Sequence, residues 1–325
     1  MNSYDQQALS TVLPTSDEWE FGGHLYGLEP LALPPSWLPR EALGVRPSLI
    51  PPPREASASL TPSDAANIDR LFWFRWITGH QATFILWQIL SSILNEAEQP
   101  DADTDALARQ ARCLVRGCSL MLLYTSSPPQ EAYERIIREP MARLHPNLTG
   151  AWARDYASVR PLIRGKTGLG NPDEASALAA ECELHETVHE GIAVRVVPSG
   201  VSLLRTPNER RSSRPLRRET LRWLYDGIFL TTRLPIGYRT LVQQLVRRLQ
   251  AILLDITVNG LYPSCASSTA EDPPQLLSTD VKELKASFTD TLHALIVCAD
   301  AEPGAFTPHS DSQTARDEQI QKGFS

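Results

Sequence analysis

The chain has 325 residues, which is enough for one large domain or two small ones with a core of their own. Apolar residues make up 42% and charged residues 21%, a balance typical of globular proteins that excludes disorder along the whole chain. The net charge of -7 gives no electrostatic reason to expect nucleic acid as the main partner. We therefore expect a small-molecule partner.

The five cysteines are scattered and form no CxxC pair, so we interpret them as reduced thiols of a cytoplasmic protein. The first twenty residues lack a basic region followed by an apolar run, so no secretory signal is expected there. The most apolar stretch, residues 71–90, contains Arg75, His80, Gln81 and Gln88, which would be costly in a membrane. It predicts a buried core helix and no membrane association.

Residues 1–60 hold nine prolines between Pro14 and Pro53, a density that permits extended or turn conformations but little helix. We expect a proline-rich arm packed on the core. Thr61-Pro62-Ser63-Asp64 then supplies a hydroxyl cap, a proline at the first helical position and an early carboxylate. These signals predict a long helix from about 62 to 96.

The rest of the chain is predicted to be mainly α. Helical spacing recurs over 102–124, after the prolines at 128–129, and from Pro172 to a predicted end at Gly191. Two β-branched runs around Pro198 in residues 192–205 predict a small β-hairpin. Further helix is expected over 216–258, interrupted near 235–237, and near 282–300, with a polar linker at 266–280. We predict one helical domain over 61–300 and a disordered tail over 301–325.

The most informative segment is the helix expected around His80. Trp76, Ile77, Phe84 and Trp87 share its helical face through spacings of three, four and seven residues. A lone histidine in an apolar helix is commonly a core residue bonded to a backbone carbonyl, and that interpretation stays open on this evidence alone. The alternative is an imidazole walled by aromatic rings at a binding site.

Residues 77–90, ITGHQATFILWQIL, resemble the first active-site helix of tryptophan 2,3-dioxygenase, with Thr78, His80, Gln81 and Ala82 matched and Gly79 inserted. Residues 124–150 are similar to that family's proline-led helix, which carries an arginine for the substrate carboxylate and is followed by a Pro-x-x-Gly turn. On this alignment Arg135 takes the arginine's place, with Arg138 one turn on. Otherwise these arginines would pair with neighbouring glutamates on a wet helix face.

The short chain and its arm resemble more closely the haem-dependent tyrosine hydroxylases of antibiotic pathways, within the same superfamily. The resemblance implies a helical bundle of the tryptophan 2,3-dioxygenase type that binds haem b, with a possible homo-oligomer. It implies hydroxylation of L-tyrosine to 3,4-dihydroxy-L-phenylalanine by hydrogen peroxide, or by O₂ plus a reductant. Catalytic His80 would handle the phenol proton, Trp76 and Phe84 would line the substrate site, and Arg135 and Arg138 would hold the carboxylate. A tryptophan-type haem mono- or dioxygenase is the alternative.

A haem needs an axial ligand, and His185 and His189 stand one turn apart on the helix that begins at Pro172. We favour His189, beside Glu186 and Glu190, because a carboxylate that accepts the second N–H orients a metal-bound imidazole and raises its basicity. His185 is the second choice.

The same residues, His185-Glu186-Thr187-Val188-His189, satisfy the HExxH pattern of zinc metalloproteases, with Glu209 available as a third ligand. Against this, the predicted helix end at Gly191 and the arginines of 205–218 do not suit a cation site. Those arginines are interpreted as a solvated loop or as partners of haem propionates. A third hypothesis is a helical binding module without catalysis, with Trp73, Trp76 and Trp87 as core.

Overall fold

The computed structural model describes residues 20–21, 24–35, 65–145, 148–197, 218–263 and 272–301. This part of the chain is mainly helical, which confirms the predicted fold class. The helices are α2 (Ala65–Glu96), α3 (Thr104–Thr125), α4 (Gln130–Tyr133), α5 (Glu139–Leu144), α6 (Tyr156–Ile163), α7 (Pro172–Val196), α8 (Arg218–Ile228), α9 (Tyr238–Asn259), α10 (Thr279–Ala286) and α11 (Phe288–Asp300), with the π-helix η2 (Glu134–Arg138) and the 3-10 turns η3 (Gly150–Trp152) and η5 (Pro274–Leu277). The strands are β1 (Glu20–Phe21), β2 (His24–Leu25), β3 (Leu31–Leu33) and β4 (Thr231–Arg233).

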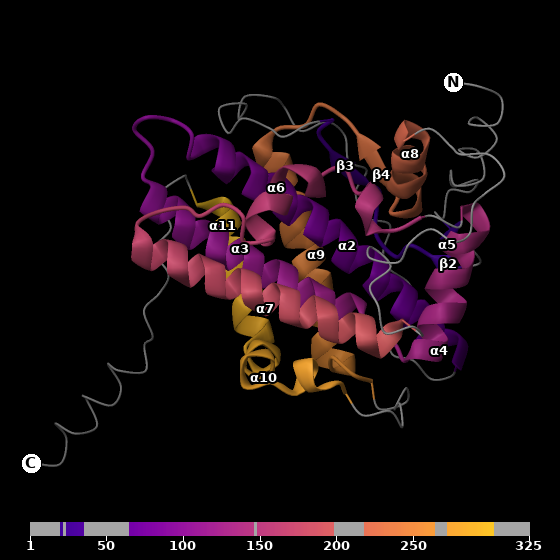
Figure 1. The fold of residues 1–325 in the computed structure, drawn as a ribbon. Coiled ribbons are helices and arrows are strands. Elements are labelled where there is room, and N and C mark those ends of the chain that lie inside the picture. Colours follow the sequence, from indigo (N-terminus) through magenta and orange to yellow (C-terminus); the bar gives the residue numbers. More distant parts are fainter. Residues whose placement is uncertain are drawn as a thin grey trace, which may run out of the picture.

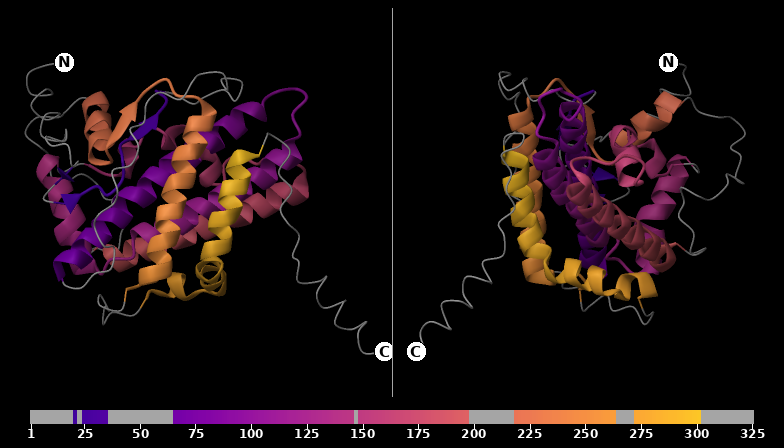
Figure 2. Two further views of the ribbon diagram at one scale, coloured as in Figure 1. Left: turned by 180° about the vertical axis from the view of Figure 1, so that it is seen from behind. Right: turned by 60° about the vertical axis from the view of Figure 1, so that its left-hand side comes forward.

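Helix α3 lies at the centre of the bundle, with α2 and α7 packed along it and α11 behind it (Figure 1). The side view in Figure 2 shows three layers. Helices α2 and α3 form the middle layer, α9 and α11 lie on one side of it, and α7 lies on the other. A helix enclosed in this way must be apolar on nearly all faces, as the sequence of α2 is from Leu71 onward. The middle layer thus fixes the position of His80 rigidly.

The buried Arg75 of α2 is explained by a complete set of acceptors. Its guanidinium donates to both carboxylate oxygens of Asp255, to the Ser127 hydroxyl and to the carbonyls of Gly260 and Leu261. The Arg75 and Asp255 side chains are fully buried, and the charge is paired and hydrogen-bonded, which is the condition for burying it. The pair therefore ties α2 to the end of α9.

Part of the predicted arm is built into the core. Strand β3 pairs in parallel with β4, and Tyr26, Leu31 and Leu33 are buried. The Gln244 amide of α9 completes this attachment, because it bonds both the N–H and the carbonyl of Ala32. Strands β1 and β2 pair antiparallel, and the residues of 1–60 other than 20–21 and 24–35 lie outside the described part of the chain.

Two predictions about residues 191–205 are corrected by the structure. Helix α7 does not end at Gly191 but continues to Val196, so residues 192–196 are helical and not a strand of the predicted hairpin. Gly191 is a place of close approach, since a Cβ there would lie 2.7 Å from Cγ of Leu276. The β-branched run stays helical because Ala193 and Val196 are buried, and burial overrides local propensity. Residues 198–205 lie outside the described part.

The remaining helices follow the predictions with two changes. The predicted interruption near 235–237 is confirmed, although α8 already ends at Ile228 and β4 intervenes before α9. The helix expected near 282–300 is two helices, α10 and α11, which meet at Ser287. No helix in the described ranges is both long and apolar enough to cross a lipid bilayer. The predicted tail beyond Ala301 lies outside the described residues.

Candidate functional site

His80 lies in a cluster of aromatic rings, as the helical spacing of the sequence predicts. Its ring centroid is 4.0 Å from that of Trp76 and 6.2 Å from that of Phe84. The structure adds Phe229, at the end of α8, whose ring stacks on the imidazole with centroids 4.7 Å apart, and Tyr133, whose ring packs edge-on against Trp76 at 5.7 Å. His80 is half-buried, so the cluster encloses most but not all of the imidazole.

The tautomer of His80 is fixed by its own helix. Nδ1 lies 2.8 Å from the carbonyl oxygen of Trp76, which can only accept, so Nδ1 carries the proton. Nε2 is then left with a lone pair. Burial lowers the pKa of His80 to about 4, although the bond to the Trp76 carbonyl opposes this shift. At neutral pH the side chain is thus an uncharged base that presents Nε2.

Phe229 reaches His80 because the turn after α8 is held at several points. Gln81, the next residue after His80, donates to the carbonyl of Phe229 at 2.7 Å, and Arg248 donates in turn to the Gln81 side chain at 2.9 Å. Tyr26 donates to the carbonyl of Ile228 at 2.8 Å. Leu230 adopts a φ of 46°, a conformation costly for a residue with a Cβ. These contacts keep the strained turn, and with it Phe229, against His80.

Gly79, the residue inserted before His80, has a structural explanation. A Cβ at this position would lie 2.4 Å from Cγ2 of Thr125 and 3.0 Å from Cδ1 of Tyr124, both on α3. Only glycine therefore allows α2 and α3 to approach so closely here. The insertion does not disturb the helix and brings the backbone of His80 against the middle of the bundle.

The two predicted carboxylate-binding arginines lie in different surroundings. Arg135 forms a bidentate pair with Asp69 of α2, and its side chain is 60% exposed. Arg138 is less exposed, donates to the carbonyl of Leu148 at 3.3 Å, and lies close enough to Tyr133 for its charge to act on that phenol. Both belong to the π-helix η2, a form that often marks functional sites. Of the two, Arg138 lies nearer to the rings around His80.

The candidate axial ligands lie on the side of α7 that faces α3. His185 is buried, and its Nδ1 is 3.2 Å from the hydroxyl of Ser119. Ser119 gives its own proton to the carbonyl of Val115, so its oxygen is free to accept the Nδ1–H of His185. Burial, followed by the nearby charges of His189 and Arg164, lowers the pKa of His185 to about 3. His189, one turn on, is half-buried.

The packing of α2 and α7 against α3 places His80 and His189 at a similar height along the bundle. Ser119 contacts His185 and Ser127 contacts Arg195, so α3 and α7 run parallel. By this register His189 is level with about residue 122 of α3, while Gly79 is level with Tyr124 and Thr125. His80 and His189 thus lie within about one helical turn of each other along α3, on the two helices that flank it.

Glu186 has a charged partner that the sequence did not reveal. Both of its carboxylate oxygens accept from Nη1 of Arg164, each at 2.9 Å. A guanidinium at this point disfavours a zinc ion, because it repels the cation and occupies the carboxylate that would act as base. Among the described residues no group of three or more histidine, cysteine or acidic side chains is arranged to hold a metal ion, and Glu209 lies outside them.

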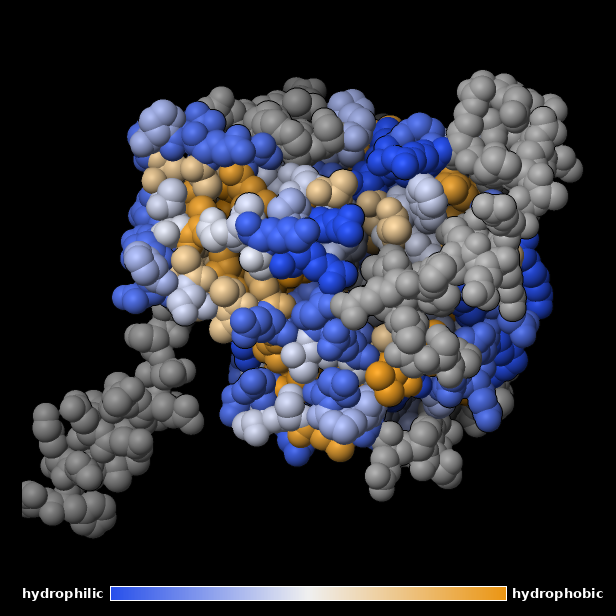
Figure 3. Space-filling view, in the orientation of Figure 1, coloured by the Kyte–Doolittle hydropathy of each residue, from blue (hydrophilic) through white to orange (hydrophobic). Residues whose placement is uncertain are grey.

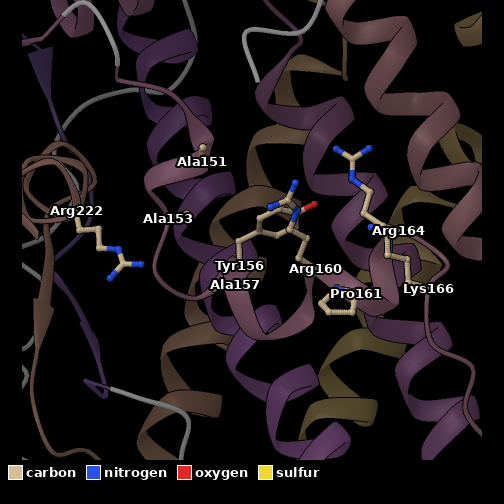
Figure 4. Close-up of a pocket in the computed structure, with 9 residues that line it drawn as sticks. All are labelled: Ala151, Ala153, Tyr156, Ala157, Arg160, Pro161, Arg164, Lys166 and Arg222. Atoms are coloured by element: carbon tan, nitrogen blue, oxygen red, sulfur yellow. The ribbon is translucent and has the colours of Figure 1, made fainter. Parts of the chain in front are cut away.

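A cleft of about 810 Å³ opens between α6 and α8. Cationic side chains enter it from both sides, Arg222 from α8 and Arg160, Arg164 and Lys166 from α6 and the turn after it (Figure 4). Strongly hydrophilic residues gather over this part of the surface, in front of α6 (Figure 3). Tyr156 and a few small side chains form the rest of the lining: Ala151, Ala153, Ala157 and Pro161.

The cleft, Phe229, Tyr225 and Tyr133 were not identified from the sequence. Phe229 is 149 positions from His80, and its own neighbourhood, YDGIFL, has no motif that would mark it as part of a site. Arg160 and Arg164 of the cleft stand one helical turn apart, but Arg222 joins them only because α6 and α8 face each other. A strongly amphipathic α8 was the one available signal, since its apolar face had to lie against a partner.

Comparison with known families supports an enzyme. Residues 41–181 match the model of the family described as SfmD 3-methyl-L-tyrosine peroxygenase. The matched range is a little under half of the chain, includes His80, Arg135 and Arg138, and ends before His185 and His189. No curated protein matches the chain significantly. Over residues 41–181 the chain is therefore similar to a family of peroxygenases, which supports an oxidoreductase.

Proposed function

We propose that the protein is a haem-dependent peroxygenase that hydroxylates the ring of tyrosine or of a ring-methylated tyrosine. The observation that carries this proposal is the fixed, uncharged imidazole of His80 among aromatic rings. The matched family acts, by its description, on 3-methyl-L-tyrosine, so a methylated phenol stands beside L-tyrosine itself as a candidate substrate. The overall change replaces a ring C–H by C–OH and reduces hydrogen peroxide to water.

The donor set of the bundle suits a haem. An axial imidazole must be neutral and must turn its free nitrogen to the iron, while its second nitrogen donates to a protein acceptor. His185 meets two of these conditions, because burial keeps it uncharged and Ser119 takes its Nδ1–H. His189, our first choice from the sequence, lies one turn further on and remains the competing ligand. A haem bound there would supply the activation of peroxide.

The residues around His80 would bind and orient the aromatic substrate. The buried indole N–H of Trp76 meets no acceptor among the described residues, so a polar atom of a ligand could accept from it. Nε2 of His80 would take the phenol proton as the ring is attacked, a role that suits a neutral imidazole. Arg138 would pair with the substrate carboxylate, and Arg135, held by Asp69, is the alternative. The rings of Phe84 and Phe229 would exclude water.

The test begins with haem binding by the purified full-length chain, followed through the Soret absorption. The loaded protein is then given hydrogen peroxide with L-tyrosine or with 3-methyl-L-tyrosine, and the products are analysed by mass spectrometry. We expect a product heavier by one oxygen atom from at least one of the two. The proposal fails if haem does not bind, or if bound haem and peroxide leave both amino acids unchanged. Loss of the Soret shift in His185→Ala or in His189→Ala identifies the axial ligand.

A further inference from the structure

We propose that the cleft between α6 and α8 binds the two propionate groups of the haem. This inference rests on the proposed function and assigns Arg160, Arg164, Lys166 and Arg222 as the cations that hold the cofactor's carboxylate edge. None of them belongs to the sites that the sequence predicted.

The charge of the cleft selects a ligand with more than one negative group. Its lining contains four cationic side chains and, among the nine described residues that form it, no acidic one. Arg160 and Lys166 form no ion pair with any other residue in the described ranges, so within these ranges no carboxylate compensates their two positive charges. A zwitterionic amino acid would bring an ammonium group into this field, whereas a porphyrin brings two carboxylates and no cation.

The shape of the lining agrees with an anionic group on an apolar body. Four of the lining residues are alanine or proline, which leave room and expose apolar surface next to the cations. The cleft is open to solvent, and carboxylates stay at such an edge because burying them fully is costly. The Trp87 ring lies 5.0 Å from Tyr156 of the cleft wall, and its buried indole N–H meets no acceptor among the described residues.

Two rows of side chains lead from the cleft toward His80. One row consists of rings, in which Tyr156 packs on Trp87, Trp87 on Phe84 at 5.7 Å and Phe84 on His80. The other follows one face of α8 and the turn after it, where Arg222, Tyr225 and Phe229 recur at spacings of three and four. Tyr225 packs on Phe84 with centroids 6.0 Å apart. The cleft is thus the outer end of the region that holds the candidate catalytic residue.

A third connection leads from the cleft to the candidate axial ligands. Arg164 lines the cleft and at the same time binds Glu186, which stands between His185 and His189 on α7. A planar cofactor with iron on α7 and carboxylates at α6 would therefore meet both groups of residues.

The test compares haem with its dimethyl ester, which lacks both negative charges. The affinity of the full-length protein for each is measured by Soret titration and by quenching of tryptophan fluorescence. The variant Arg160→Ala/Lys166→Ala removes the two positive charges that no carboxylate in the described ranges compensates. Arg239→Ala/Lys282→Ala is the matched control, because these two exposed cations lie on α9 and α10 and their loss changes the net charge equally. Circular dichroism checks that both variants fold.

We expect the cleft variant to bind haem about tenfold more weakly than the wild type and the control, with a smaller dependence on salt. All three proteins should bind the dimethyl ester with equal affinity. Equal haem affinity of the cleft variant and the control would overturn the inference and leave the proposed function standing. Loss of binding of tyrosine or 3-methyltyrosine to the variant, with haem affinity unchanged, would overturn it in favour of a substrate site. No binding of either porphyrin to the wild type would overturn the proposed function as well.

Discussion

The imidazole of His80 stacks on the phenyl ring of Phe229, with centroids 4.7 Å apart and planes inclined by 24°. His80 lies on α2 and Phe229 in the turn after α8, and the contact depends on the bond from Gln81 to the Phe229 carbonyl. Phe229 covers one face of the imidazole and contributes to its low pKa by excluding water. The properties of His80 as a base are thus determined by α8 as well as by its own helix.

Replacement of His80 tests its role as the base. In His80→Ala and His80→Gln we expect unchanged folding and haem binding, but a fall in kcat of about 10²–10⁴-fold, the usual contribution of general acid–base catalysis. His293→Ala is the control, since that histidine is exposed on α11. The measurement is steady-state turnover with peroxide. A kcat within about threefold of the wild type would exclude His80 from proton transfer.

The pH dependence of kcat/KM in the wild type should reflect the pKa of His80. Because the pKa of His80 is lowered to about 4, the side chain is an uncharged base at every pH well above this value. We expect kcat/KM to fall on the acid side around pH 4, and circular dichroism at each pH separates this fall from unfolding. An acid limb near the ordinary histidine value of about 6.5 would mean that the base is another histidine or that His80 is solvated.

The two arginines of η2 should differ in their effect on substrate binding. Arg138→Gln removes the cation nearer to Tyr133 and Trp76, so we expect KM to rise about tenfold or more with kcat little changed. Arg135→Gln removes a side chain that is 60% exposed and already paired with Asp69, so KM should change by less than about threefold. The opposite ranking would assign the carboxylate to Arg135, as the sequence alignment indicated.

Gln81 should act on His80 through Phe229. Gln81→Leu removes a buried bond to the Phe229 carbonyl and leaves Arg248 without one of its acceptors, which should lower the free energy of unfolding by about 1–3 kcal/mol. We also expect the pKa of His80, followed by NMR, to rise from about 4 toward its ordinary value as the strained turn relaxes.

Gln110→Leu is the matched control for that variant. Gln110 also donates a buried side-chain bond to a backbone carbonyl, that of Cys298, far from the aromatic cluster. The variant Gln110→Leu should lower the free energy of unfolding to a similar extent without changing the titration of His80. If both variants leave the pKa of His80 unchanged, Gln81 stabilises the fold but does not position Phe229.

The close contact of α2 and α3 at Gly79 can be tested by overpacking and rescue. Gly79→Ala places a methyl group 2.4 Å from Cγ2 of Thr125, so we expect a loss of stability of about 1–3 kcal/mol in denaturant unfolding. Gly79→Ala/Thr125→Ser removes that methyl group but keeps the hydroxyl, and should recover part of the loss. Equal stability of the single and double variants would mean that Tyr124, and not Thr125, limits the approach.

The stability of the haem-free protein should depend on pH through His185. The pKa of this buried residue is lowered to about 3, so the unfolded chain binds more protons than the folded one between about pH 6.5 and 3. The contribution of His185 to the free energy of unfolding is therefore fully present above about pH 6.5. It is lost as the pH falls, by up to about 1.4 kcal/mol per pH unit. His185→Asn should flatten this dependence in urea unfolding, and an unchanged slope would assign it to other groups.

The sequence by itself determined most of the long helices. The apolar spacing of α2 and α3 and the proline at the start of α7, Pro172, were sufficient, because helix formation depends on periodicity and on start signals that lie close along the chain. The same local information placed Trp76 and Phe84 beside His80, since residues three and four apart on a helix are neighbours.

Only the tertiary structure decided which distant residues meet. The close approach of Leu276 explains why Gly191 lies within α7, although a glycine at that point in the sequence is equally typical of a helix end. The same holds for Phe229 on His80, for Ser119 on His185 and for the cations of the cleft. Such contacts depend on how the helices pack, and the free energy that selects one packing is summed over the whole core, so no local stretch of sequence reports it.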